Sequence, residues 1–312
     1  DRAAQEQAEG CQAALSDTGL SASQRIYAQL ELADAWYSLD RFDESQEVYQ
    51  RVRESVPNNV EALNGLAWVH WSRDEYEPAI ELFEMSVARR PTSQGLAGLA
   101  SSKRHSDAIT SDGFVELMQA ALALNPKYTW AQRELGWGLL NFGQPAAAEA
   151  AFRDAVEIAP SNQWNLYALG YALNDLDRHE EALEVLLRVD PDEDTPTGYF
   201  SQLSLARYYT RDYKAALKAA DLTIEGWPDR GTGYVRKARA LEALGRRAEG
   251  VVLLQEREAL RHDGFVAYWL SDLLYEEGNV RAAMDVMDRS VEQGTADSYN
   301  HELRAFFAIE LQ

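Results

Sequence analysis

Cysteine is nearly absent: Cys11 is the only one among 312 residues, so no disulfide bond can form within the chain. We expect Cys11 on the buried face of the first helix as a small apolar residue, with a reactive thiol or a bond to another chain as the alternative. No apolar run approaches the roughly 18–20 residues that a membrane-spanning helix needs, and no signal peptide is recognisable. Proline is also scarce, with nine residues, while 46% of the chain is hydrophobic. This composition predicts a large packed core and argues against disorder.

Positive charge is scarce relative to negative charge. Lys and Arg total 30 against 51 Asp and Glu, which gives a formal net charge of −21. Such an excess repels the phosphates of nucleic acids and the head groups of anionic lipids. We therefore expect no nucleic-acid partner and no membrane insertion, and we expect partners that are basic or carry basic patches.

Recognisable catalytic and metal-binding patterns are missing as well. The five histidines include no pair four residues apart that could hold a metal on one helix. There is no Gly-x-Ser-x-Gly elbow and no phosphate-binding Gly-Lys-Ser/Thr loop. The acidic stretch 190–194 lacks the spacing and the glycine of a calcium loop, so a solvated linker is expected there. We expect no catalytic residue, no metal and no cofactor, and hence no enzyme.

Six prolines follow a regular period along the chain. The successive intervals between them are 34, 35, 34, 31 and 37 residues, and the last two sum to two periods of 34. A period of 34 is typical of a two-helix solenoid unit, in which each proline stands where the second helix must stop. These prolines are Pro57, Pro91, Pro126, Pro160, Pro191 and Pro228.

Small residues recur in pairs twelve positions apart, which predicts two antiparallel helices that approach closely within each repeat. One pair, Ala206 and Ala216, is only ten apart and predicts a shortened turn. A bulky residue four positions after the second small residue is expected to fill the gap beyond it. The regular pairs are Ala33 and Ser45, Ala67 and Ala79, Gly136 and Ala148, Gly170 and Ala182, Ala238 and Gly250, and Ser271 and Ala283.

At these residues the chain resembles the tetratricopeptide repeat (TPR) family, most fully over residues 129–160. The resemblance implies an all-α, right-handed helix-turn-helix solenoid of about seven good repeats, one degenerate repeat and end caps. We expect a single solenoid over 1–312. Its parts are an N-terminal half repeat or cap (1–25), two repeats (26–91), the degenerate repeat (92–125), five repeats (126–295) and a C-terminal capping helix (296–312).

The degenerate repeat departs from the pattern because Ser102 and Phe114 occupy the paired positions. Its first helix, from Gly95 to about Arg104, is expected to be short, and a polar break is expected near residues 106–113. Either this repeat has decayed and still packs, or it acts as a hinge that shapes the binding groove.

The small residue of each pair lies on one face of the first helix of its repeat. A second row of residues on that helix, here called the inner stripe, lines the concave groove in the resembled family. It comprises Tyr27, Leu30, Asp34 and Tyr37 in the first repeat, and Phe200, Leu203, Arg207 and Thr210 in the fifth. Over seven repeats this stripe is rich in aromatic residues, which predicts either inter-repeat packing or a partner-facing belt. The candidate partner-binding residues are Tyr27, Asn64, Trp68, Trp71, Trp130, Arg133, Trp137, Asn141, Trp164, Tyr167, Tyr171, Asn174, Arg207, Arg211 and Arg239.

The leading hypothesis is a non-catalytic interaction scaffold that binds an extended peptide or a partner helix in this aromatic groove. The arginines Arg133, Arg207, Arg211 and Arg239 indicate either local ion pairs or a site for a free carboxylate. The alternative is a TPR protein of the cell envelope that binds a glycan or small molecule, and a third hypothesis is self-assembly through the end caps. Residues 8–21 resemble the starts of bacterial TPR proteins, many of them exported, which favours the periplasm or cell envelope over the cytoplasm.

Overall fold

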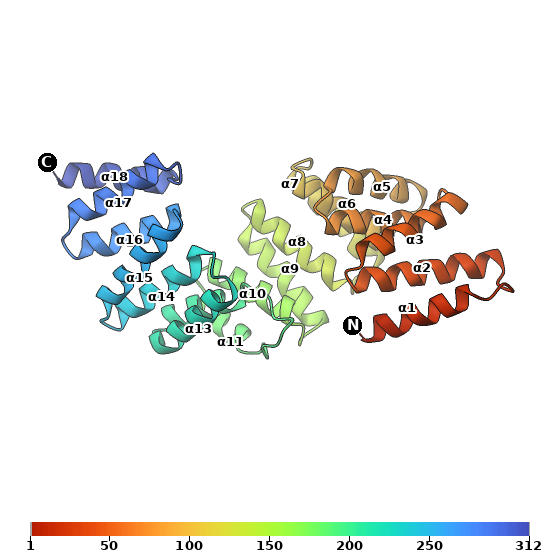
Figure 1. The fold of residues 1–312 in the computed structure, drawn as a ribbon, viewed down its shortest axis with the longest axis horizontal. Coiled ribbons are helices and arrows are strands. Elements are labelled where there is room, and N and C mark those ends of the chain that lie inside the picture. The colour runs from red at the N-terminus through yellow and green to blue at the C-terminus, as the bar shows by residue number, and fades with distance from the viewer. Residues whose placement is uncertain (1, 312) are drawn as a thin grey trace. The chain divides into compact units, whose positions relative to one another are not determined.

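The computed structural model describes residues 2–311, which form eighteen α-helices and no β-strand (Figure 1). The all-helical helix-turn-helix architecture expected from the sequence is confirmed. Along the chain the helices divide into two compact units, with the boundary between Ile158 and Ala159. None of the helices in this described range is long and apolar enough to cross a membrane.

Unit 1 contains nine helices, in which consecutive helices pack against one another. Most of them are 13 or 14 residues long, close to four turns. The helices are α1 (Arg2–Leu15), α2 (Ala22–Ser38), α3 (Phe42–Ser55), α4 (Val60–Ser72), α5 (Tyr76–Arg89), α6 (Ser93–His105), α7 (Ser111–Leu124), α8 (Thr129–Asn141) and α9 (Pro145–Ile158).

Unit 2 also contains nine helices and repeats the same pairing. Its second helix, α11, has only 8 residues and is followed by the irregular acidic segment. The helices are α10 (Gln163–Asp175), α11 (His179–Leu186), α12 (Tyr199–Tyr209), α13 (Tyr213–Gly226), α14 (Gly231–Ala243), α15 (Arg247–Leu260), α16 (Gly264–Glu276), α17 (Val280–Glu292) and α18 (Ser298–Glu310).

The turn inside each helix pair has one residue in the left-handed region, where φ is positive. Aspartate and glycine tolerate this conformation best, and they occupy all but one of these places. The exception is Arg211, with φ of 65°. The residues are Asp40, Asp74, Asp107, Gly143, Asp177, Arg211, Gly245 and Gly278.

The small residues bring the paired helices together as expected. The hydroxyl of Ser45 on α3 donates to the backbone oxygen of Ala33 on α2 at 2.9 Å, and Gly250 on α15 would bring a Cβ to 3.1 Å from the backbone oxygen of Ala238. The bulky residues that follow are buried, which confirms their packing role. They are Tyr49, Phe83, Phe152, Leu186, Leu254 and Met287.

The fifth repeat corrects the sequence interpretation. The residue that meets Ala216 is Ser204 and not Ala206, because the Ser204 hydroxyl donates to the backbone oxygen of Ala216 at 2.9 Å. Ser204 and Ala216 are twelve apart like the other pairs, so no turn is shortened. The two-residue shift moves the inner stripe of α12 away from Arg207 and onto Tyr208.

The degenerate repeat also differs from expectation, because α6 has 13 residues and is as long as α4. Counted from the first helical residue, Ala100 and not Ser102 takes the place that Ala67 has in α4. The turn between α6 and α7 covers residues 106–110, two more than the usual three, which accounts for the misread register. Phe114 is accommodated by the next repeat, since a Cβ at Gly138 would lie 2.1 Å from its ring. The hinge hypothesis for this repeat stays a prediction.

Cys11 is partly buried in α1 and packs against the core of the first helices. Burial raises the pKa of its thiol, and the nearby Glu31 raises it further. A thiol with a raised pKa is a poor nucleophile, so the packing role expected from the sequence fits this environment.

Candidate functional site

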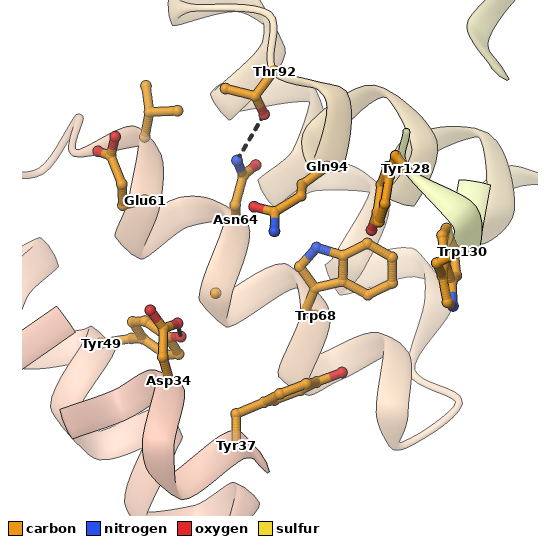
Figure 2. Close-up of a pocket in the computed structure, with 12 residues that line it drawn as sticks. Asp34, Tyr37, Tyr49, Glu61, Asn64, Trp68, Thr92, Gln94, Tyr128 and Trp130 are labelled. Carbon is orange, nitrogen blue, oxygen red and sulfur yellow. Dashed lines mark hydrogen bonds between the residues drawn. The ribbon is translucent and has the colours of Figure 1, made fainter. Parts of the chain in front are cut away.

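A pocket of about 430 Å³ opens among α2, α3, α4, α6 and the start of α8 in unit 1 (Figure 2). Its volume lies within the range of about 300–1,000 Å³ that is usual for ligand sites. Both aromatic rings and polar side chains line it. The lining residues are Asp34, Tyr37, Tyr49, Val60, Glu61, Asn64, Gly65, Trp68, Thr92, Gln94, Tyr128 and Trp130.

The floor of the pocket is built by a tyrosine that packs over a glycine. Tyr49 is 2% exposed, and a Cβ at Gly65 would lie only 2.2 Å from its Cζ atom. Only glycine therefore lets the ring lie flat against α4. In this position the Tyr49 hydroxyl donates a hydrogen bond to the carboxylate of Asp34 on α2. Burial, followed by the charge of Asp34, raises the pKa of Tyr49, so it stays protonated as a donor.

One wall is fixed by an asparagine and a helix cap. Asn64 is 6% exposed, and its Nδ2 donates to Oγ1 of Thr92 at 3.0 Å (Figure 2). The same Thr92 oxygen caps α6 by accepting from the backbone N–H of Gly95. Because Thr92 is held by the cap, Asn64 has a defined orientation at the pocket wall. Its Oδ1 is buried and accepts no hydrogen bond within residues 2–311.

Next to Asn64 lies a cluster of three tryptophans from α4 and α8, of which Trp68 and Trp130 line the pocket. The ring of Trp68 meets the ring of Trp130 edge-on at 4.8 Å, and the ring of Trp71 lies 5.5 Å from Trp68 and 5.8 Å from Trp130. Trp68 also packs on Phe83 at 5.3 Å, while Nε1 of Trp71 donates to Ser101 at 3.1 Å. Trp68 and Trp130 are half-buried, so each keeps part of its ring available to a ligand while the rest is held by packing.

The charged groups of the pocket are both acidic. Glu61 is paired with Arg90, but Asp34 has no ion pair within the described chain. Asp34 is exposed on one side, but its pKa is raised, chiefly because the protein around it removes water from the carboxylate. The hydrogen bond from Tyr49 lowers the pKa in part, and the charge of Glu31 raises it further. No lysine, arginine or histidine lines the pocket.

Unit 2 has a separate arginine cluster on α14. The guanidinium of Arg239 lies 4.4 Å from the ring centre of Tyr208 and 4.5 Å from that of Trp269, between α12 and α16. Arg236, one turn earlier, has a buried Nε without a hydrogen-bond partner among the described residues. Burial, followed by the charge of Arg239, lowers the pKa of Arg236 to about 10. Among residues 2–311 no group of three or more His, Cys, Asp or Glu side chains could hold a metal ion.

Comparison with known proteins gives the family of this repeat. Residues 30–94 and residues 139–201 each match a model of the tetratricopeptide repeat. The chain is a tetratricopeptide repeat protein. Such repeats indicate a protein-interaction scaffold. No curated protein matches the sequence.

Two solved structures share the TPR fold with this chain. A chain of the "APC/C hetero-tetramer Cut9-Hcn1" has a TM-score of 0.66 at 13% identity; the alignment covers 98% of this chain and 58% of that one. A tetratricopeptide repeat protein from Parabacteroides merdae ATCC 43184 has a TM-score of 0.63 at 12% identity, covering 80% of this chain and 98% of that one. The chain thus spans little more than half the length of the Cut9-Hcn1 chain. At these identities the likeness establishes the fold alone.

Within the TPR units, three of the candidate residues line the unit 1 pocket together, namely Asn64, Trp68 and Trp130. Trp71 supports them from behind. Tyr27 is 65% exposed on α2 outside the pocket, and Trp137 packs on Phe152 at 5.2 Å. The other unit 1 candidates are Arg133, whose pKa is lowered by burial, and the exposed Asn141.

The unit 2 candidates do not form one site. Tyr167 and Tyr171 meet edge-on at 6.4 Å, and Trp164 is 47% exposed. Asn174 is buried and donates to the backbone and the side chain of Gln202, which gives it a structural role. Arg207 is paired with Asp212 at 2.7 Å, and Arg211 is exposed in its turn. Of the four arginines proposed to bind a carboxylate, Arg207 therefore already has one from its own chain.

Several pocket residues were missed from the sequence. Asp34 and Tyr37 belong to the predicted inner stripe, so their positions alone could have identified them as candidate binding residues. Tyr49 was read only as a packing residue, and its contact with Asp34 has no signature in the repeat pattern. Gln94 lies in the degenerate repeat, whose register was misread, and Tyr128 lies just after it.

Proposed function

We propose that the protein is a non-catalytic scaffold that binds an extended segment or a helix of a partner protein in the unit 1 pocket. The observation that supports this most is the combination of half-buried tryptophans and fixed polar groups around one hollow on the inner stripe. Aromatic residues held by packing dominate protein interfaces because they bury much area at little cost in side-chain entropy. Trp68 and Trp130 have this property.

The polar groups fit the recognition of a peptide. Asn64 is held in place by Thr92, and Gln94 is exposed at the rim. The exposed amide of Gln94 can both donate and accept hydrogen bonds, so it matches the alternating N–H and C=O groups of an extended backbone, while Asn64 shapes the wall beside it. A protein partner is therefore favoured over a glycan, although tryptophan faces also suit sugar rings.

The proposal is tested by selecting binders from a random peptide library on the immobilised chain and measuring their affinity by fluorescence anisotropy. Trp130→Ala is expected to weaken binding by about tenfold or more, since a buried aromatic anchor contributes about 1–3 kcal/mol. Gln94→Trp fills the pocket from an exposed position and should block binding without disturbing the core. Trp227→Ala in unit 2, which removes a partly buried tryptophan elsewhere, is the matched control.

A result in which no peptide is selected, or in which both pocket variants bind like the control, would refute this function. Quenching of tryptophan fluorescence by oligosaccharides but not by peptides would instead support the glycan alternative. Circular dichroism of each variant establishes that the repeats are still folded.

A further inference from the structure

The charges and rings of the unit 1 pocket define the chemistry of its occupant. We propose that this pocket takes a basic side chain of the partner, a lysine or an arginine, with the carboxylate of Asp34 as its counter-ion. The inference rests on the proposed function and specifies which residue of the partner the site selects.

Asp34 is a carboxylate that lacks a cation. Its Oδ1 accepts the Tyr49 hydroxyl, and no ion pair involves it in the described part of the chain. The two arginines nearest along the chain are already used, since Arg41 pairs with Glu44 and Arg25 donates to the backbone oxygens of Leu15 and Asp17. A carboxylate whose charge is disfavoured by its surroundings gains most from a cation supplied by a ligand.

The rings around Asp34 suit a cation. Figure 2 shows Asp34 on one side of the pocket and Tyr128 and Trp130 on the other, with Tyr37 and Trp68 between them. Aromatic faces attract ammonium and guanidinium groups through the negative charge of the ring face, and tryptophan does so best. The methylene stem of a lysine or an arginine can meanwhile pack against the same rings.

Other occupants fit less well. An anionic ligand would meet Asp34 and Glu61 without any lining cation to receive it. A neutral apolar side chain would use the rings but would leave Asp34 beside it without a counter-charge. The net charge of −21 further favours encounters with basic segments.

The test uses the peptides selected on the wild-type chain and a cycle of paired changes. In each peptide every lysine is replaced in turn by norleucine, and every arginine by citrulline, which keeps the stem and removes the charge. In the protein, Asp34→Asn keeps the shape and the hydrogen-bond acceptor for Tyr49 while it removes the charge. Asp107→Asn, in the turn between α6 and α7, removes one charge of unit 1 away from the pocket and serves as control.

The expected result is that selected peptides share a basic residue and that its neutral replacement weakens binding to wild type by about tenfold. In Asp34→Asn the same replacement should change the affinity little, whereas Asp107→Asn should behave like wild type. Selected peptides without a common basic residue, or an equal loss with Asp34→Asn and wild type, would overturn the cation site. If those peptides still required Trp130, the interaction function would stand; if no peptide is selected at all, both proposals fall.

Discussion

The substitution Gly65→Ala tests the packing that shapes the pocket floor. The added methyl group would lie 2.2 Å from Cζ and 2.4 Å from Cε1 of Tyr49, far inside contact distance. Gly65 is in the middle of α4, so its backbone cannot yield without breaking helical hydrogen bonds. The tyrosine ring must move, although it is 2% exposed and its hydroxyl is bound to Asp34.

The expected change in the free energy of unfolding has one stabilising and two destabilising contributions. Alanine is favoured over glycine inside a helix by about 1 kcal/mol. Overpacking of a filled core costs about 1–3 kcal/mol. If the ring moves enough to stretch the hydrogen bond to the Asp34 carboxylate, up to about 1.5–3 kcal/mol of further stability is lost. We expect a net destabilisation of about 2 kcal/mol, together with weaker peptide binding because the floor is displaced.

The measurement is urea denaturation followed by far-ultraviolet circular dichroism, comparing transition midpoints because repeat arrays need not unfold in two states. Gly10→Ala in α1 is the matched control, since a Cβ there meets nothing within 4 Å. It should stabilise by about 0.5–1 kcal/mol through helix propensity alone. If Gly65→Ala is as stable as Gly10→Ala, the packing argument for the pocket floor is wrong. In a Tyr49→Ala background the cost of the Gly65→Ala substitution should largely vanish, because the ring that it displaces is gone.

Two further predictions concern buried groups. His179 is 8% exposed, stacks on Tyr209 at 4.0 Å, and has its pKa lowered, chiefly because burial disfavours the imidazolium. The unfolded chain therefore binds this proton at a higher pH than the folded chain, and the free energy of unfolding should fall as the pH drops below about 6.5. His179→Asn should reduce that loss. Urea titrations of both proteins at about pH 7.5 and 5.5 measure it. Glu134→Leu should cost about 3 kcal/mol because it leaves Arg104, whose side chain is 8% exposed, without its partner. The double change Arg104→Met and Glu134→Leu should be nearly neutral, and an equally unstable double variant would contradict this reasoning.

The repeat pattern in the sequence predicted most of the fold. Proline intervals and paired small residues predicted the helix pairs, because proline cannot continue a helix beyond its first turn and a small residue is needed where two helices approach closely. Both rules are local, and they therefore held in Ala33 with Ser45 and in Ala238 with Gly250. The pattern failed at Ala100, where the turn after α6 is two residues longer, and in the fifth repeat, where Ala206 was chosen in place of Ser204 although the spacing of twelve is kept. In both cases another small residue stands two positions away, and one sequence does not show which of the two meets the second helix.

The aromatic residues of the inner stripe were visible in the sequence, but the sequence could not distinguish between packing of neighbouring repeats and a partner-facing belt. Trp137 and Trp71 turn mainly toward neighbouring rings, whereas Trp68 and Trp130 also face the pocket. Helical periodicity assigns residues to a face but does not say how much of that face the next repeat covers.

The sequence by itself determined the fold class, the helix pairing and the acidic character, since each depends on residue type and spacing along one chain. Tertiary structure alone decided that Tyr49 lies over Gly65 and reaches Asp34, and that this carboxylate faces a ring of aromatic side chains without a cation of its own. The contact of Tyr49 with Gly65 and the pocket itself join helices of different repeats, whereas Tyr49 and Asp34 lie on the two helices of one repeat. The geometry of these contacts depends on how the helices stack, which no local pattern encodes.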